Sequence, residues 1–177
     1  KQFSSRSFWP EFLFHTCDIT VAVEILRQNE VLSRNAADAG GGLICDVANQ
    51  GALWNNPVAH DFVRLYFRPK NKFHLKTEGI KSLSDNYRVD PHMAIPVTFL
   101  FRFQDVMTRD DCFFLPENFA IAGSEPLSGD QNFGSIDFAK TYHDSAPSAG
   151  QMDAIHRARM AEAVVQNSLS LDFCHAV

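Results

Sequence analysis

The stretch that decides the fold is Phe62-Val63-Arg64-Leu65-Tyr66-Phe67-Arg68-Pro69-Lys70. Its alternation predicts a β-strand over residues 62–68, because successive side chains of a strand point to opposite faces of the sheet. One face is apolar and can enter a core: Val63, Leu65 and Phe67. The other face is aromatic and basic: Phe62, Arg64, Tyr66 and Arg68.

The aromatic and basic face of this strand has two interpretations. Two guanidinium groups beside an aromatic ring suit a ligand that carries both a phosphate and a ring. Basic residues on an edge strand also protect a sheet against aggregation, without any ligand. The strand alone leaves both interpretations open.

Composition bounds the class of protein. A chain of 177 residues suits one domain over residues 1–177, and a hydrophobic content of 45% supplies a core, so disorder is not expected. The net charge of -5 argues against bulk binding of duplex DNA, which relies on many phosphate contacts. The segment from Arg64 to Lys81 nevertheless holds six basic residues against one acidic residue. That imbalance indicates a local anion site or a solvated basic loop.

The four cysteines stand at positions 17, 45, 112 and 174 and form no CxxC pair. This spacing disfavours a zinc ribbon and predicts reduced thiols, no metal and a cytoplasmic setting. The sequence shows no apolar run near 18 residues and no signal-peptide pattern, so no contact with a membrane is expected.

Further along the chain, strands and helices alternate without a βαβ rhythm or a Gly-rich nucleotide motif, which predicts an α+β fold. Extended segments are expected at residues 11–16, 62–68, 94–103, 112–115, 161–165 and 170–173. Pro96 marks its segment as an edge strand or as the start of a strand. Helices are expected at residues 19–27 and 151–160, and loops or short elements at residues 46–61, 71–92 and 122–135. Asp18 is expected to cap the first helix, whose buried face would hold Ile19, Ala22, Val23 and Leu26.

Glu162 is the strongest candidate for chemistry, since it follows a predicted helix and opens an apolar strand. A carboxylate there is costly unless it is paired or faces a ligand. It can hold a ribose hydroxyl and stabilise a developing cation. It can also be an ordinary helix-terminal glutamate that is paired with Arg157 or Arg159.

Two further polar groups are ambiguous. His15-Thr16 can grip a ribose, or can be a core histidine followed by a helix-cap residue. Tyr142-His143-Asp144 can contain a general base or form a simple turn. The other histidines show no metal spacing.

Taken in order, these segments resemble the DarT family of NAD-dependent nucleic-acid ADP-ribosyltransferases, which are toxins of bacterial toxin–antitoxin and phage-defence systems. The resemblance is collinear over most of the chain. It is carried by His15-Thr16, Glu24-Ile25-Leu26, Val31-Leu32-Ser33, Asp46, Asn49, residues 63–70, Thr77-Glu78-Gly79-Ile80, residues 95–101, Asn118-Phe119-Ala120, Asp137-Phe138, Tyr142-His143-Asp144, residues 159–162 and Leu169-Ser170-Leu171-Asp172.

The resemblance implies an α+β ADP-ribosyltransferase-like fold, in which two small, mainly antiparallel sheets form an NAD cleft flanked by helices. It implies a pentosyltransferase that uses NAD as co-substrate and modifies a nucleic-acid base. The implied catalytic residues are Glu162 and Arg64. The implied NAD contacts are His15, Thr16, Ser33, Asp46, Arg64, Tyr66 and Arg68.

Within that implied site, His15 and Thr16 would face one ribose of NAD, Arg64 or Arg68 would hold the pyrophosphate, and Tyr66 would stack near the nicotinamide. The carboxyl group of Glu162 would lie across a hollow from the two guanidinium groups.

Two departures from the family pattern bear on the substrate. The familiar Pro-Arg after the strand is Pro69-Lys70 here, so a bidentate donor becomes a point charge. Residues 49–56 lack the arginine-rich stretch of thymidine-modifying members, which favours guanine as the acceptor.

The target base must be accessible, so single-stranded DNA is the expected nucleic acid. The candidate strand contacts are Trp54, Lys70, Lys72, Phe73, Lys76 and His143. A macrodomain-type, DarG-like antitoxin is the implied protein partner. Three alternatives remain: transfer to RNA or protein, hydrolysis of NAD without an acceptor, and a nucleic-acid-binding module without catalysis.

Overall fold

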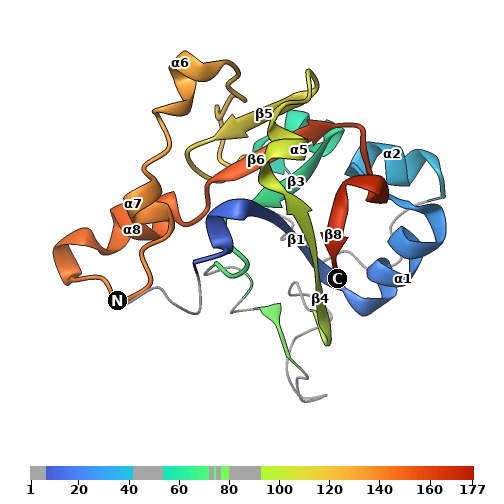
Figure 1. Cartoon of the computed structure of the whole chain (residues 1–177), viewed down its shortest axis with the longest axis horizontal. Coiled ribbons are helices and arrows are strands. Elements are labelled where there is room, and N and C mark those ends of the chain that lie inside the picture. The colour runs from blue at the N-terminus through green and yellow to red at the C-terminus, as the bar shows by residue number, and fades with distance from the viewer. Residues whose placement is uncertain (1–6, 42–53, 72–73, 75–76, 80–92) are drawn as a thin grey trace.

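The computed structural model describes residues 7–41, 54–71, 74, 77–79 and 93–177, and its centre is a six-stranded sheet in the order β5-β6-β3-β1-β4-β8 (Figure 1). Every neighbouring pair in this sheet is antiparallel. Its strands are β1 (Phe12–Asp18), β3 (Phe62–Tyr66), β4 (Pro96–Arg102), β5 (Cys112–Leu115), β6 (Glu162–Gln166) and β8 (Cys174–Ala176). A second, antiparallel sheet pairs β2 (Glu30–Leu32) with β7 (Ser168–Ser170). The α+β class with antiparallel sheets is therefore confirmed.

The helices are short and flank the larger sheet. They are α1 (Ile19–Gln28), α2 (Arg34–Ala39), α5 (Phe103–Met107), α6 (Asp130–Phe133), α7 (Phe138–Thr141) and α8 (Met152–Ala158). Turns of 3₁₀ helix span Trp9–Glu11, Pro57–Asp61, Ala149–Gln151 and Leu171–Phe173. In Figure 1, α6, α7 and α8 lie on one side of the sheet and α1 and α2 on the other. Among the described residues, no helix is long and apolar enough to cross a bilayer.

The two faces of β3 pack against different parts of the protein, as the alternation predicts. Val63, Leu65 and Phe67 are buried in the main core, together with Phe99 and Phe101 of β4. On the opposite face, Val164 packs with Leu115 and Phe119 in a smaller apolar cluster. The β5-β6-β3 part of the sheet is therefore covered on both sides, and a polar residue on either face must find a partner.

The strands β1 and β3 meet at a single registered pair, Phe14 opposite Tyr66. In contrast, β1 and β4 pair along seven positions, and β3 and β6 along five. The larger sheet therefore consists of two three-stranded parts, β5-β6-β3 and β1-β4-β8, that are joined at one point in the described structure. Four of the candidate site residues gather around this junction: His15, Arg64, Tyr66 and Glu162.

Several local predictions hold and others do not. Asp18 caps α1 by accepting a hydrogen bond from the backbone N–H of Thr20, as expected. Pro96 is the first residue of β4, and β4 lies inside the sheet, so the strand-start interpretation is the correct one. The expected loop at 122–135 contains α6, and the expected strand at 170–173 is mostly a 3₁₀ turn between β7 and β8.

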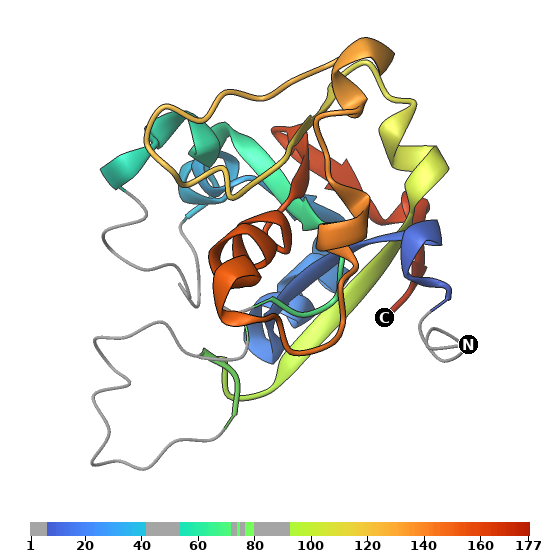
Figure 2. The ribbon, with the colours of Figure 1, turned by 90° about the vertical axis from the view of Figure 1, so that its left-hand side faces the viewer.

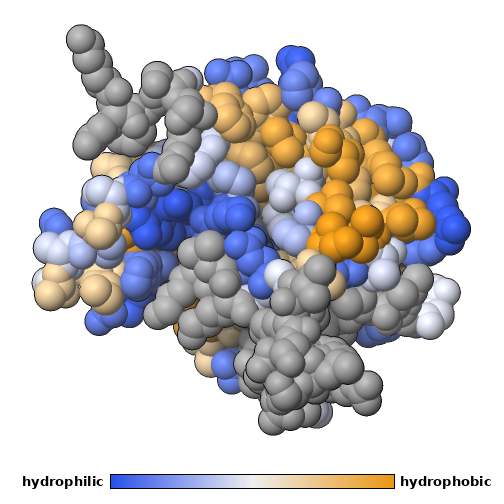
Figure 3. All heavy atoms as spheres, turned by 90° about the horizontal axis from the view of Figure 1, so that it is seen from below, coloured by the Kyte–Doolittle hydropathy of each residue, from blue (hydrophilic) through white to orange (hydrophobic). Residues whose placement is uncertain are grey.

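The predicted buried face of α1 is correct at Ala22 and wrong at its other three positions. Ala22 and Ile25 are buried, whereas Ile19 and Val23 are 40% exposed and Leu26 is 54% exposed. Seen from below, apolar atoms gather on the side of the molecule where α1 lies (Figure 3). Six of the ten residues of this helix are apolar, and together they form an arc wider than the buried face, so the periodicity could not select which part of that arc packs against the core.

Candidate functional site

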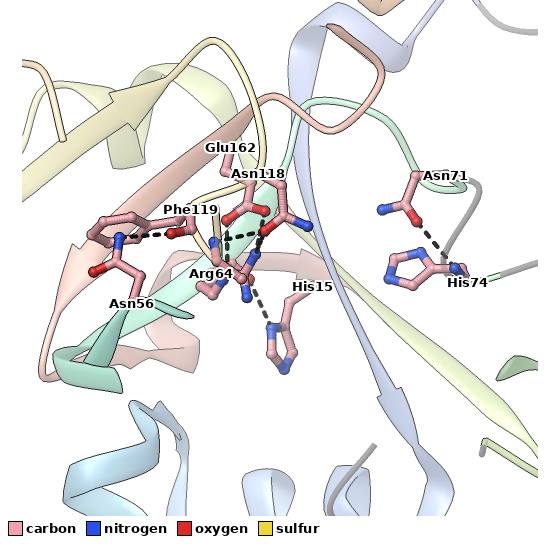
Figure 4. Close-up of polar contacts among 9 residues, drawn as sticks. His15, Asn56, Arg64, Asn71, His74, Asn118, Phe119 and Glu162 are labelled. Atoms are coloured by element: carbon pink, nitrogen blue, oxygen red, sulfur yellow. Dashed lines mark hydrogen bonds and ion pairs between the residues drawn. The ribbon is translucent and has the colours of Figure 1, made fainter. Parts of the chain in front are cut away.

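A bidentate ion pair between Arg64 and Glu162 forms the centre of the site (Figure 4). Arg64 lies on β3 and Glu162 opens β6, where it stands opposite Tyr66 in the antiparallel register. The Nε atom of Arg64 donates to Oε2 of Glu162 at 2.7 Å, and Nη2 donates to Oε1. The Glu162 side chain is 0% exposed, while that of Arg64 is 29% exposed. The carboxylate thus lies under the guanidinium group, which reaches the surface.

Two other donors act on the Glu162 carboxylate: the hydroxyl group of Tyr66 and the backbone N–H of Phe119 lower its pKa. Burial raises the pKa of Glu162 although Arg64, Tyr66 and Phe119 all favour the charged form. Burial and the nearby Glu162 raise the pKa of Tyr66. Burial opposes the charge of Arg64, but Glu162 raises the pKa of Arg64 overall, so the guanidinium group stays protonated.

The segment Asn118-Phe119-Ala120 covers the ion pair. Asn118 accepts hydrogen bonds through Oδ1 from Nη2 of Arg64 at 2.7 Å and from the backbone N–H of Ala120 at 2.8 Å. Asn56, which is buried, holds the same segment by donating to the carbonyl groups of Phe119 at 2.9 Å and Ser124 at 3.0 Å. In Figure 2, this segment belongs to the long connection between β5 and α6, which passes beside the turn that begins at Pro57.

His15 of β1 adds an imidazole at the junction of the two parts of the sheet. Its Nδ1 atom lies 3.1 Å from the backbone oxygen of Arg64. A carbonyl oxygen can only accept, so Nδ1 carries the hydrogen and Nε2 is left as an acceptor. Burial lowers the pKa of His15, which keeps the ring neutral. The side chain therefore presents a hydrogen-bond acceptor close to Arg64.

His74 is a second neutral histidine beside this group. Its ring meets the ring of Tyr66 edge to face, with centroids 5.1 Å apart, and its backbone N–H donates to Oδ1 of Asn71. Burial lowers the pKa of His74 to about 4. Tyr66 itself is buried between this ring and Glu162, so the expected stacking of Tyr66 on a nicotinamide is not supported by its surroundings.

The expected ridge of two guanidinium groups is wrong. Arg68 lies beyond the last residue of β3, in a bend, and its Nη1 atom donates to the carbonyl groups of Thr141 at 3.2 Å and His143 at 3.1 Å. The ring of Trp9 lies over this guanidinium group at 5.2 Å. Arg68 is buried and ties the end of β3 to the segment after α7. The expected hollow between Glu162 and the basic groups is also wrong, because Glu162 contacts Arg64 directly.

Thr16 and Ser33 also have other partners. His15 and Thr16 point to opposite faces of β1, and the hydroxyl group of Thr16 pairs with that of Thr98 at 3.0 Å. The expected pair of neighbouring ribose contacts is therefore split between two faces of the strand. The Ser33 hydroxyl group is buried and caps α2 by accepting from the backbone N–H of Ala36.

The candidate DNA contacts fall into two groups. Lys70 is exposed and pairs with Glu78 at 3.0 Å. The ring of His143 lies near Arg159 and Ser145, and its carbonyl group binds both Arg68 and Arg159. Trp54 is 80% exposed. The other predicted DNA contacts, Lys72, Phe73 and Lys76, lie outside the described residues, as does the predicted NAD contact Asp46.

The arrangement suits chemistry on a ligand with a phosphate and a sugar. The partners of Arg64 within the described structure occupy Nε and Nη2, so the N–H groups of Nη1 are left for an anion. Glu162 supplies a negative charge and His15 an acceptor nearby. The described residues hold no cluster of three His, Cys, Asp or Glu side chains that could bind a metal ion.

The sequence interpretation missed the roles of Asn56, Asn118 and His74. Asn118 belongs to one of the segments that carry the family resemblance, but nothing in the sequence links it to Arg64, which lies 54 positions away. Asn56 is close to a turn-forming proline, a context in which asparagine is common without a tertiary role. Only the pairing of strands brings these residues together.

Comparisons with known proteins agree with this fold. A family model described as "ssDNA thymidine ADP-ribosyltransferase, DarT" matches residues 14–177. The solved structure of Thermus sp. 2.9 DarT in complex with NAD+ has a TM-score of 0.65 and 16% identity, covering 93% of this chain and 79% of that one. The complex of the same protein with ADP-ribosylated ssDNA has a TM-score of 0.68 at the same identity and coverage.

A third solved structure, Thermosipho africanus DarTG in complex with ADP-ribose, has a TM-score of 0.62 and 16% identity. The match covers 93% of this chain and 42% of that one. A search of curated proteins finds no significant match. Identity of this level shows a shared fold, whereas the family model spans most of the sequence. The chain therefore belongs to the DarT family.

Proposed function

We propose that this protein transfers ADP-ribose from NAD to a base of single-stranded DNA, with the Arg64–Glu162 pair as its catalytic centre. The observation that carries the proposal is a fully buried carboxylate in bidentate contact with an arginine that keeps Nη1 for a ligand. Family membership supplies the reaction class, and the DarT relatives bound to NAD+ and to ADP-ribosylated ssDNA supply the ligands.

Each group has a role that is consistent with its contacts. Nη1 of Arg64 binds a phosphate oxygen of NAD and holds the pyrophosphate still, which favours attack at the ribose carbon. Arg68 is the weaker candidate for this role because its Nη1 already donates to two carbonyl groups. The acceptor Nε2 of His15 takes a hydrogen bond from a ribose hydroxyl group.

In the reaction, the bond between the ribose C1′ atom and the nicotinamide nitrogen breaks, and nicotinamide leaves with the electron pair. Positive charge develops on the ribose, and the Glu162 carboxylate stabilises it through the 2′-hydroxyl group. Each Glu162 oxygen accepts one hydrogen bond from Arg64, which leaves a second lone pair that can accept from that hydroxyl group. A base nitrogen then bonds to C1′ and loses a proton, which Glu162 accepts more readily because burial raises its pKa.

The acceptor base is proposed to be guanine, because residues 49–56 carry no arginine and the usual Pro-Arg is Pro69-Lys70. Thymine is the second candidate, since the description of the matching family model names thymidine. Mass spectrometry of single-stranded oligonucleotides that differ at one central base, after incubation with NAD, separates the two. An ADP-ribose adduct on the guanine oligonucleotide supports the first, and one on the thymine oligonucleotide the second.

Replacing Glu162→Gln is expected to lower transfer at least about 100-fold, because it removes the negative charge while keeping the shape of the side chain. The matched control is Glu24→Gln, a partly exposed glutamate of α1 that pairs with Arg27. The control should keep normal transfer. Transfer retained by the Glu162→Gln protein would exclude this residue from the mechanism.

The same assay tests the alternatives. Release of nicotinamide without any acceptor identifies an NAD glycohydrolase, and label on RNA or protein identifies a different acceptor. Binding of oligonucleotides with no consumption of NAD identifies a binding module. Each of these results would replace the proposed DNA modification.

We also propose the biological setting of a toxin in a toxin–antitoxin or phage-defence system, with a DarG-like macrodomain protein as antitoxin. The support is family membership and the relative named DarTG. Expression of the chain should arrest growth in an activity-dependent way, so the Glu162→Gln protein should not. Arrest by both proteins would contradict a toxic role for base modification.

A further inference from the structure

Asn118 lies in the segment that covers the site, and its side chain binds both this segment and the guanidinium group of Arg64. Its Oδ1 atom accepts from the backbone N–H of Ala120, two positions along, which closes a local turn. The same oxygen accepts from Nη2 of Arg64 at 2.7 Å. The next residue, Phe119, is fully buried, and its backbone N–H lowers the pKa of Glu162. The tripeptide therefore binds Arg64 through Asn118 and adds a dipole that favours the charged form of Glu162.

The hydrogens of the Arg64 guanidinium group can be accounted for one by one. An arginine carries a single hydrogen on Nε and two each on Nη1 and Nη2. Glu162 takes the hydrogen of Nε and one from Nη2, and Asn118 takes the other from Nη2. Within the described structure, Nη1 alone keeps its hydrogens for a ligand. Glu162 thus holds the Nε–Nη2 side of the planar guanidinium group, and Asn118 holds the remaining hydrogen of Nη2.

We infer that Asn118 is a positioning residue, which holds the guanidinium plane of Arg64 so that Nη1 faces a phosphate of NAD. This inference rests on the proposed function. Without Asn118, one hydrogen of Nη2 would bind water instead of the protein, and the orientation of the guanidinium group would be less restricted. With Asn118 in place, both neighbouring nitrogens are held and the direction of Nη1 is set before NAD arrives, which lowers the cost of ordering on binding.

Two substitutions separate the contact with Arg64 from the local turn. Asn118→Ser keeps an oxygen that can accept from the N–H of Ala120, but its side chain is too short to reach Arg64. Asn118→Asp keeps an acceptor for both donors. The control is Asn132→Ser, which replaces an exposed asparagine of α6 that donates to the carbonyl group of Ser128.

The expected result is a rise of about tenfold in the KM for NAD of the Asn118→Ser protein, as for the loss of one hydrogen bond that orients a charged group. The KM for the oligonucleotide should not change. The Asn132→Ser protein should stay within about twofold of the wild type in both constants. The Asn118→Asp protein keeps the acceptor but adds a negative charge beside the proposed phosphate site, so its KM for NAD should rise less than that of the Asn118→Ser protein. Calorimetric titration with NAD should show the same order of affinities.

Three results would overturn the inference. One is an unchanged KM for NAD in the Asn118→Ser protein. Another is an equal loss in the Asn118→Ser and Asn118→Asp proteins, since the aspartate keeps the acceptor. The third is an Asn118→Ser protein that does not fold, which would make the residue structural. A wild-type protein that neither binds nor consumes NAD marks failure of the proposed function itself, and it is seen before any variant is compared.

Discussion

At the scale of single residues, Arg64 and Arg68 show that the position of an arginine in or beyond a strand decides which groups it binds. Alternation predicts both on the same face of one strand. Arg64 lies within β3 and meets Glu162, whereas Arg68 follows the end of the strand, where alternation no longer applies. Arg68 binds carbonyl groups near α7 instead. The two arginines should therefore respond differently to substitution.

We expect Arg68→Met to lower the free energy of unfolding by about 1–3 kcal/mol, because the hydrogen bonds to two carbonyl groups are lost. The KM for NAD should stay near that of the wild type. Urea unfolding together with steady-state kinetics measures both quantities. A marked rise in the KM for NAD with little loss of stability would show that Arg68 binds NAD.

We expect Arg64→Lys to lower transfer at least about tenfold, because an ammonium group cannot bind Glu162 in a bidentate way and still reach a phosphate. The comparison with Arg68→Lys in the transfer assay is the control. Equal activities of the two lysine variants would contradict the distinct roles of these arginines.

At the scale of elements, α1 shows the limit of periodicity. The helix begins at the expected residue because Asp18 can satisfy the backbone N–H of Thr20, a local interaction. Its orientation depends on the chain beyond its C-terminal end. Asn29 adopts a left-handed conformation with φ of 59°, and the chain then enters β2, which pairs with β7. This connection turns Ala22 and Ile25 toward the core and leaves Leu26 outside.

We expect Ile25→Ala to cost about 2–4 kcal/mol of unfolding free energy, since Ile25 is 5% exposed and its removal leaves a cavity. Leu26→Ala should change stability by less than about 1 kcal/mol, because this side chain is 54% exposed. Urea unfolding of both variants is the measurement. A larger loss for Leu26→Ala would mean that the sequence-based face of the helix is the buried one.

At the scale of the whole molecule, the site depends on how the two parts of the larger sheet meet. Glu162 and Arg64 belong to the β5-β6-β3 part, and His15 belongs to the β1-β4-β8 part. The bond from His15 to the backbone oxygen of Arg64 crosses the junction close to the Phe14–Tyr66 pair. His74 adds a buried imidazole beside Tyr66 at the same place.

This junction predicts a loss of stability in mild acid. Burial lowers the pKa of His74 to about 4, whereas an unfolded histidine titrates near about 6.5. Between these values the unfolded chain binds a proton that the folded chain does not, so the free energy of unfolding falls as the pH falls from about 6.5 to about 4. The contribution of His74 is up to about 3 kcal/mol.

Urea unfolding across this pH range measures the effect. The His74→Phe protein keeps a ring against Tyr66 and should show a shallower fall, while the exposed His175→Gln should follow the wild type. His15, whose pKa is also lowered by burial, should leave a residual slope in the His74→Phe protein. The same slope in all three proteins would contradict a neutral, buried His74.

The sequence by itself determined those features that depend on neighbours in the chain. The alternation of residues 62–67 placed Val63, Leu65 and Phe67 in the core, and the side chain of Asp18 began α1. Glu162 could be singled out, because a carboxylate at the start of an apolar strand requires a partner. The collinear motifs indicated the family, since they combine many weak local signals.

Only the tertiary structure decided which partners these groups have. The antiparallel register of β3 and β6 brings Glu162 under Arg64, and the connection after β5 adds Asn118 from 54 positions away. No local rule encodes such contacts, because they depend on the order in which strands pair and on where each strand ends. For the same physical reason, Arg68 lies outside the expected site although it is only four positions from Arg64.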